Sequence, residues 1–152
     1  MKLSIQVIGK KPTVYKKINI EIIQELLFNE FYPQDRQERF LSLTFLSKNE
    51  IRKLNFSYRK KNATTNVLAF PLPITKEGYL GDIAVCLEEV EKESKEQEKD
   101  FEKHLVHIII HGILHLVGLD HKKKEEKKEM ESIEVRILNE LGIADPYHLD
   151  LL

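Results

Sequence analysis

The segment from residue 101 to 117 constrains the fold most, because it has helical spacing and is apolar on nearly every side. Its apolar members include Leu105, Val106, Ile108, Ile109, Ile110, Ile113 and Leu114. Asp100 stands directly before it, and aspartate is a preferred N-cap residue. A helix with so little polar surface belongs inside a domain. The sequence therefore predicts a buried central helix with the other elements packed around it.

Four short apolar runs predict a small sheet. They lie at 3–7, 40–46, 67–70 and 83–86, and Gly or Pro residues bound several of them. Amphipathic spacing predicts a helix over 18–31, a second helix beginning at a capping box on Ser47, and a last helix that ends at Gly142. The charged stretch 88–96 predicts an exposed helix with i,i+4 ion pairs. The pattern favours an α/β (α+β) fold.

Length and composition indicate one soluble domain over residues 1–152. The chain has 152 residues, is 41% hydrophobic and 32% charged, and holds only 6 Gly and 5 Pro, which excludes collagen-like and wholly disordered classes. Its 24 Lys and Arg against 25 Asp and Glu predict no general attraction to polyanions, so any such site must be a local patch. A single cysteine, Cys86, and an opening without an apolar leader favour the reducing cytoplasm. The apolar run 108–119 is shorter than a membrane span needs.

Five of the six histidines lie within residues 104–121. His111 and His115 are i and i+4 on the central helix, so both imidazoles can reach one ion. Gly118 can adopt the left-handed conformation that ends a helix, which would let His121 return as a third ligand. Three imidazoles with a fourth position for water are typical of a catalytic zinc site, whereas structural zinc sites are usually thiolate-rich.

Three neighbouring residues keep more than one interpretation. His104 and His107 continue the histidine stripe and could orient metal ligands, but imidazoles at the core edge are the favoured interpretation. Asp120 could orient a ligand imidazole or cap a turn, and the sequence does not decide between the two.

The spacing of His111, His115 and His121 equals that of the metzincin peptidases. Those enzymes carry a glutamate general base directly after the first histidine. This chain has Gly112 there, which has no side chain to take a proton from water. Peptidase chemistry of the usual kind is therefore disfavoured.

The string from His111 to His121 closely resembles the signature of the YbeY family of bacterial single-strand-specific endoribonucleases. Further matching segments are Tyr58-Arg59, 65–71 and 80–83. Asn66 and Ala69 stand where that family usually has Asp and Ser, and Asn62 stands where Asp is common.

The resemblance implies a fold with a small sheet beside a buried helix, one zinc ion on His111, His115 and His121, and a catalytic arginine at Arg59. It also implies a role in 16S rRNA 3′-end maturation and ribosome quality control, with single-stranded RNA and the ribosome or small-subunit assembly proteins as partners. Neither DNA nor a membrane is expected as a partner.

RNA binding requires local positive charge, and residues 52–61 supply it. Arg52, Lys53, Arg59, Lys60 and Lys61 form a compact basic cluster. Tyr58 and Phe70 could stack on unpaired bases, although aromatic residues near a strand are more often core.

Three functions remain open from the sequence. The first is a zinc-dependent endoribonuclease, with Arg59 offsetting negative charge on the phosphate. The second is a metal-dependent hydrolase of another class, such as a divergent peptidase, which Gly112 opposes. The third is a non-catalytic ribosome-assembly factor with a structural metal.

Overall fold

The computed structural model describes residues 2–34, 36–73, 77–118 and 124–147. The elements in chain order are β1 (Leu3–Val7), α1 (Thr13–Lys16), α2 (Ile20–Phe31), β2 (Arg39–Phe45), α3 (Lys48–Arg59), β3 (Val67–Pro71), β4 (Tyr79–Val85), α4 (Leu87–Glu96), α5 (Phe101–Leu116) and α6 (Lys124–Glu140).

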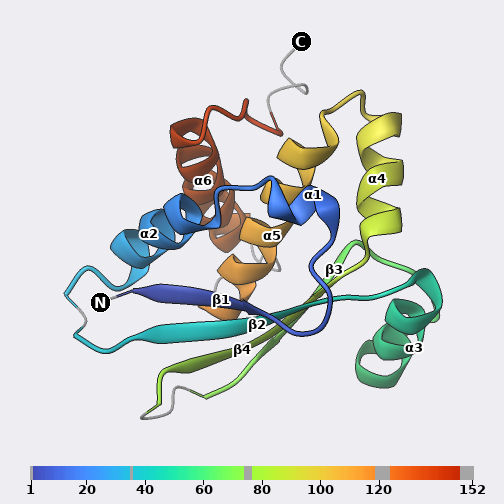
Figure 1. Cartoon of the computed structure of the whole chain (residues 1–152), viewed down its shortest axis with the longest axis horizontal. Helices are drawn as coiled ribbons and strands as arrows, with labels where there is room; N and C mark the ends of the chain where they lie inside the picture. Colours follow the sequence, from blue (N-terminus) through green and yellow to red (C-terminus); the bar gives the residue numbers. More distant parts are fainter. Residues whose placement is uncertain (1, 35, 74–76, 119–123, 148–152) are drawn as a thin grey trace.

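The four strands form one mixed sheet in the order β1-β2-β4-β3. β1 and β4 both pair with β2 in parallel, and β3 pairs with β4 antiparallel as an edge strand. Helices α1, α2, α4, α5 and α6 lie over one face of the sheet, and α3 lies apart from them beyond one end of the strands (Figure 1). The α/β class and the small sheet expected from the sequence are therefore confirmed.

Helix α5 is the centre of the main core. Leu105, Ile109, Ile110, Ile113 and Leu114 on this helix are all 0% exposed. Asp100 caps it, since its side chain accepts a hydrogen bond from the backbone N–H of Lys103 at 3.0 Å. The predicted buried central helix is confirmed, because its apolar side chains find packing partners on several sides at once.

The edge strand β3 separates two apolar clusters. Val67 and Ala69 pack on the main core with α5, whereas Leu68 packs with Ile51 and Cys86 in a smaller cluster. Alternate residues of a strand point to opposite faces. Helix α3 therefore contacts the face of β3 opposite to the one that α5 covers.

Most element boundaries agree with the sequence prediction to within a few residues. The capping box at Ser47 is present, with Ser47 Oγ accepting from Glu50 N and Glu50 Oε1 accepting from Ser47 N. Helix α4 differs from the expected exposed helix, because Val90 and Ser94 are buried against neighbouring elements. Helix α1 was not predicted, since a single turn is too short to show periodicity.

In the described part of the chain, no helix combines the length and apolarity that crossing a membrane requires.

Candidate metal centre

Four histidines of α5 form a continuous stripe along one side of the helix. Neighbouring rings of His104, His107, His111 and His115 have centroids 5.8, 6.2 and 4.9 Å apart in that order. The stripe follows the three- and four-residue spacing of one helical face. His104 is buried, while the other three rings are partly exposed.

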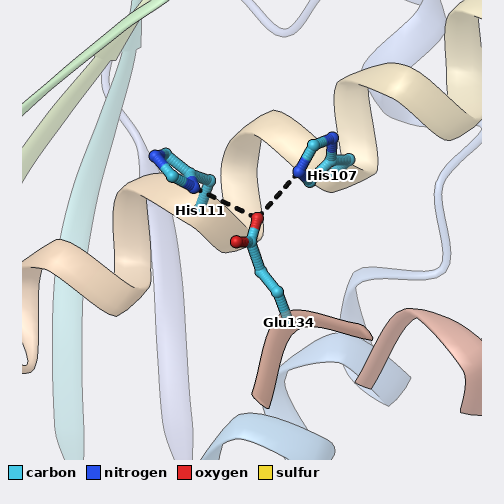
Figure 2. Close-up of side chains that lie close together, drawn as sticks. All are labelled: His107, His111 and Glu134. Atoms are coloured by element: carbon cyan, nitrogen blue, oxygen red, sulfur yellow. Dashed lines mark hydrogen bonds and ion pairs between the residues drawn. The ribbon is translucent and has the colours of Figure 1, made fainter. Parts of the chain in front are cut away.

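The carboxylate of Glu134 on α6 joins two of these histidines (Figure 2). Its Oε2 atom lies 2.7 Å from His107 Nε2 and 3.1 Å from His111 Nδ1, and its Oε1 accepts a hydrogen bond of 2.8 Å from the Tyr147 hydroxyl. Burial alone would raise the pKa of Glu134, whose residue is 0% exposed, but the contacts with His107 and His111 lower it to about 2. This carboxylate is therefore an acceptor at neutral pH.

An ionised Glu134 selects the tautomer of His111. The carboxylate accepts a hydrogen bond from Nδ1–H, which leaves the lone pair of a neutral imidazole on Nε2. That Nε2 atom lies 3.3 Å from His115 Nε2. Two nitrogen ligands about 2.0–2.1 Å from a tetrahedral zinc ion lie about 3.3–3.4 Å apart. The two Nε2 atoms thus have the spacing of two ligands of one ion.

A second grouping of possible ligands lies beside the first. His107, His111 and Glu134 each offer one ligand atom, and these atoms lie within 4.8 Å of one another. The distance of 2.7 Å between His107 Nε2 and Glu134 Oε2 is shorter than the separation of about 3.3 Å expected for two ligands of a tetrahedral zinc ion. It is an ordinary hydrogen-bond length. The geometry therefore favours Glu134 as a carboxylate that orients His111 rather than as a ligand.

The third histidine of the sequence prediction falls outside the described residues. His121 and Asp120 both belong to the segment 119–123, so their roles stay predictions. The chain before them behaves as expected: α5 ends at Leu116, and Gly118 has a φ of +99°, in the left-handed region that favours glycine.

Gly112 lies on the side of α5 that faces the sheet. A Cβ atom at this position would lie 3.0 Å from Val67 Cγ2 and 3.4 Å from Ile83 Cγ2. Metzincins carry their glutamate at the position of Gly112. In this protein, side chains of the sheet occupy the space that a longer side chain at this position would need.

His104 makes a separate, partly buried network with α4 and the residue before β3. Its Nε2 atom lies 3.0 Å from Glu93 Oε1, and the Asn66 amide donates to both oxygens of Glu93 at 3.1 Å. Burial alone would raise the pKa of Glu93, but hydrogen bonds from His104 and Asn66 hold it below its usual value.

The sequence favoured His104 and His107 as imidazoles at the core edge without a part in the metal site. The structure supports this interpretation for His104 and corrects it for His107. His104 fits it, with a buried ring in a structural network. His107 does not, because it shares the Glu134 oxygen that contacts His111.

Arg59 lies elsewhere, exposed in the last turn of α3. Helix α3 packs on β3 through Ile51 and Leu54, on the face of that strand opposite to α5. The structure thus brings His111 and His115 together, and the catalytic role of Arg59 stays a prediction.

Sequence reasoning missed Glu134 and Tyr147. Glu134 occupies a buried position of α6 together with Met130, Ile137 and Leu138. A lone carboxylate in an otherwise apolar helical stripe was the signal that could have found it, because a charge at such a position needs a partner. Tyr147 comes from the turn after α6, where the sequence shows no periodicity.

The comparisons with known proteins agree with the resemblance in the histidine segment. The sequence profile of the family described as Endoribonuclease YbeY matches residues 5–142. Proteins named Endoribonuclease YbeY from Polynucleobacter asymbioticus and Ruthia magnifica are 47% and 43% identical over 107 and 130 residues. These matches cover 70% and 84% of this chain and 69% and 84% of the two relatives.

A solved structure shows the same fold. The solution structure of TM1509 from Thermotoga maritima has a TM-score of 0.58 and 28% sequence identity, covering 95% of this chain and 99% of that one. The profile match spans nearly the whole chain, including both α5 and α6. The chain therefore belongs to the endoribonuclease YbeY family.

Proposed function

We propose that this protein is a zinc-dependent endoribonuclease that cleaves single-stranded RNA. The observation that carries the proposal is the pair of Nε2 atoms of His111 and His115, 3.3 Å apart, with Glu134 fixed behind His111. Family membership supports the reaction class, since the relatives are named endoribonucleases. Such enzymes are hydrolases.

His111 and His115 would hold the zinc ion, with His121 as the proposed third ligand. Zinc in a three-histidine site supplies a Lewis acid and a bound water of lowered pKa. Glu134 holds His111 in the tautomer that presents Nε2, and Tyr147 satisfies the other oxygen of this carboxylate. The donor set suits zinc, because imidazole nitrogen is one of its common ligands.

Arg59 is proposed as the catalytic cation. Its guanidinium can make two parallel hydrogen bonds to phosphate oxygens and offset their negative charge. Arg59 is exposed in the last turn of α3, so an RNA phosphate can reach its guanidinium from solvent. Gly112 cannot act as a base, so the proposal assigns no side chain of α5 to that role.

The cellular role we propose is 16S rRNA 3′-end maturation and ribosome quality control in the cytoplasm, with small-subunit assembly proteins as partners. The resemblance of the histidine and Arg59 segments to the family supports this role. The local basic cluster on α3 is consistent with an RNA substrate.

Cleavage assays test the proposal. Zinc-loaded wild-type protein should cut a labelled single-stranded RNA and leave the matching duplex intact. His115→Ala should abolish cleavage while the fold survives, and Arg59→Lys should lower kcat if the guanidinium contacts the reacting phosphate. Zinc binding with no cleavage of any RNA would contradict the nuclease proposal and favour an assembly factor or another hydrolase.

A further inference from the structure

Helix α3 carries a shallow hollow on the surface that faces away from the small apolar cluster. The hollow has a volume of about 380 Å³ and is lined by Arg52, Lys53, Phe56 and Asn62. We call these four residues the α3 surface. The side of α3 that packs inward carries Ile51 and Leu54 instead. The α3 surface is therefore a separate feature from the histidine stripe of α5.

Helix α3 carries two exposed aromatic rings, of which Phe56 lines the hollow. Phe56 is 54% exposed and Tyr58 is 69% exposed. Tyr58 contacts Phe70 of β3 edge to face, with ring centroids 5.0 Å apart, so its ring is supported from the sheet. Phe56 contributes to no apolar cluster that the described residues form. Exposed aromatic faces beside cations are typical of sites that stack unpaired bases.

The charge around the α3 surface is strongly positive, although the whole chain carries −1. Residues 48–61 hold six Lys or Arg and a single acid, Glu50. Glu50 is engaged in the capping box with Ser47 and also lies near Lys53. Arg52 donates to the side-chain oxygen of Asn49 at 3.0 Å rather than to a carboxylate. Most of this positive charge is therefore available to a polyanion.

We infer that the α3 surface binds a segment of single-stranded RNA that flanks the site of cleavage. This inference rests on the proposed function. A base stacks on Phe56, phosphates meet Arg52 and Lys53, and the Asn62 amide faces a base edge. All four groups line one hollow, so adjacent nucleotides can engage them together.

The position of β3 gives this site a role in substrate choice. The α3 surface and the histidine stripe belong to helices on opposite faces of the edge strand, so one RNA that reaches both must turn around β3. An unpaired strand can make such a turn and splay its bases, whereas an A-form duplex presents no free base faces. The inference therefore offers a reason for a preference for single strands.

Binding titrations test the inference independently of cleavage. The probe is a fluorescein-labelled single-stranded RNA long enough to span both helices. It is titrated with His115→Ala protein, in which cleavage should be abolished, and each substitution below is compared with that parent protein; a gel confirms that the RNA stays intact. Phe56→Ala should weaken binding about 5- to 100-fold, as expected for losing one base–aromatic stack. Arg52→Ala with Lys53→Ala should weaken binding and reduce its salt dependence.

The matched control removes two cations from another exposed helix. Lys127→Ala with Lys128→Ala on α6 has the same change in charge and should leave the affinity unchanged. If this control weakens binding as much as the α3 pair does, the effect is one of total charge, and the inference is wrong. Thermal unfolding of each variant checks that these exposed substitutions preserve the fold.

Phe56→Leu separates stacking from apolar contact. Stacking requires the aromatic face, so Phe56→Leu should bind as weakly as Phe56→Ala, and Phe56→Tyr should bind as wild type. Full RNA affinity in Phe56→Leu or Phe56→Ala would overturn the inference and leave the α3 surface as a contact for a protein. If wild-type protein cleaves no RNA but the α3 variants still bind RNA more weakly than their parent, only the proposed function is contradicted.

Discussion

Glu134 Oε2 lies 3.1 Å from His111 Nδ1, so a fully buried carboxylate on α6 sets the orientation of a histidine on α5. The same oxygen also lies 2.7 Å from His107 Nε2. The candidate metal centre therefore depends on the packing of two consecutive helices, α5 and α6, against each other.

Glu134→Gln should weaken zinc binding. An amide cannot accept from His107 and His111 with one oxygen and also from Tyr147 with its other atom. Loss of a carboxylate that orients a metal ligand typically costs about 10- to 100-fold in metal affinity. A competition titration with a zinc chelator measures the change. Tyr147→Phe is the control, because it removes only the outer hydrogen bond and should cost less than Glu134→Gln.

The acid stability of the metal-free protein should depend on Glu134. Its pKa is about 2 in the folded protein against 4.5 for the unperturbed group. A carboxyl group whose pKa is depressed by folding contributes stability that is complete above the unfolded pKa and is lost as the pH falls toward the folded one. Urea unfolding at about pH 6 and about pH 3 should show a larger loss for wild type than for Glu134→Gln. Equal losses would contradict this assignment.

Gly112→Glu should destabilise the protein strongly and create no peptidase. The new side chain would start 3.0 Å from Val67 Cγ2 and force a carboxylate against the sheet. We expect a loss of more than about 3 kcal/mol in the free energy of unfolding, because burial of an unpaired charge adds to overpacking. Gly112→Ala is the matched control and should change stability by less than about 2 kcal/mol, since the gain in helix propensity offsets a tight methyl contact. Equal stabilities of the two variants would refute the prediction.

Asn66→Asp should destabilise the fold at neutral pH. It replaces an amide that donates to both oxygens of Glu93 with a second carboxylate at the same distance. We expect a cost of about 1–3 kcal/mol, which should shrink as the pH falls and one of the two carboxyls takes a proton. Denaturant unfolding at two pH values measures both effects. Asn62→Asp, at an exposed position of the same loop, should show neither.

Much of the fold was predictable because its signals are local. The all-round apolarity of 101–117, the capping box at Ser47 and the short apolar runs each predicted an element that the structure contains. The strand order β1-β2-β4-β3 was not predictable, since pairing depends on contacts between segments far apart in the chain. The one-turn helix α1 was missed because four residues show no period.

The candidate site was predictable only in part, for the same reason. The i,i+4 spacing of His111 and His115 is a property of one helix, and the structure brings these two side chains together as expected. Glu134 lies 23 residues later, and its pairing with His111 appears only when α6 packs on α5. The packing of α3 on the face of β3 opposite to α5 likewise follows from the sheet and not from local sequence.

The zinc content of wild type and two variants tests the central claim most directly. Each protein is loaded with zinc, passed through a desalting column and measured by elemental analysis. Our account places the ion on the Nε2 side of His111, so wild type should hold about one zinc ion per chain and His115→Ala should lose it. His107→Ala should still bind zinc, because His107 contacts the site only through Glu134. Full zinc content in His115→Ala together with its loss in His107→Ala would contradict the account and place the metal at the His107, His111 and Glu134 group instead.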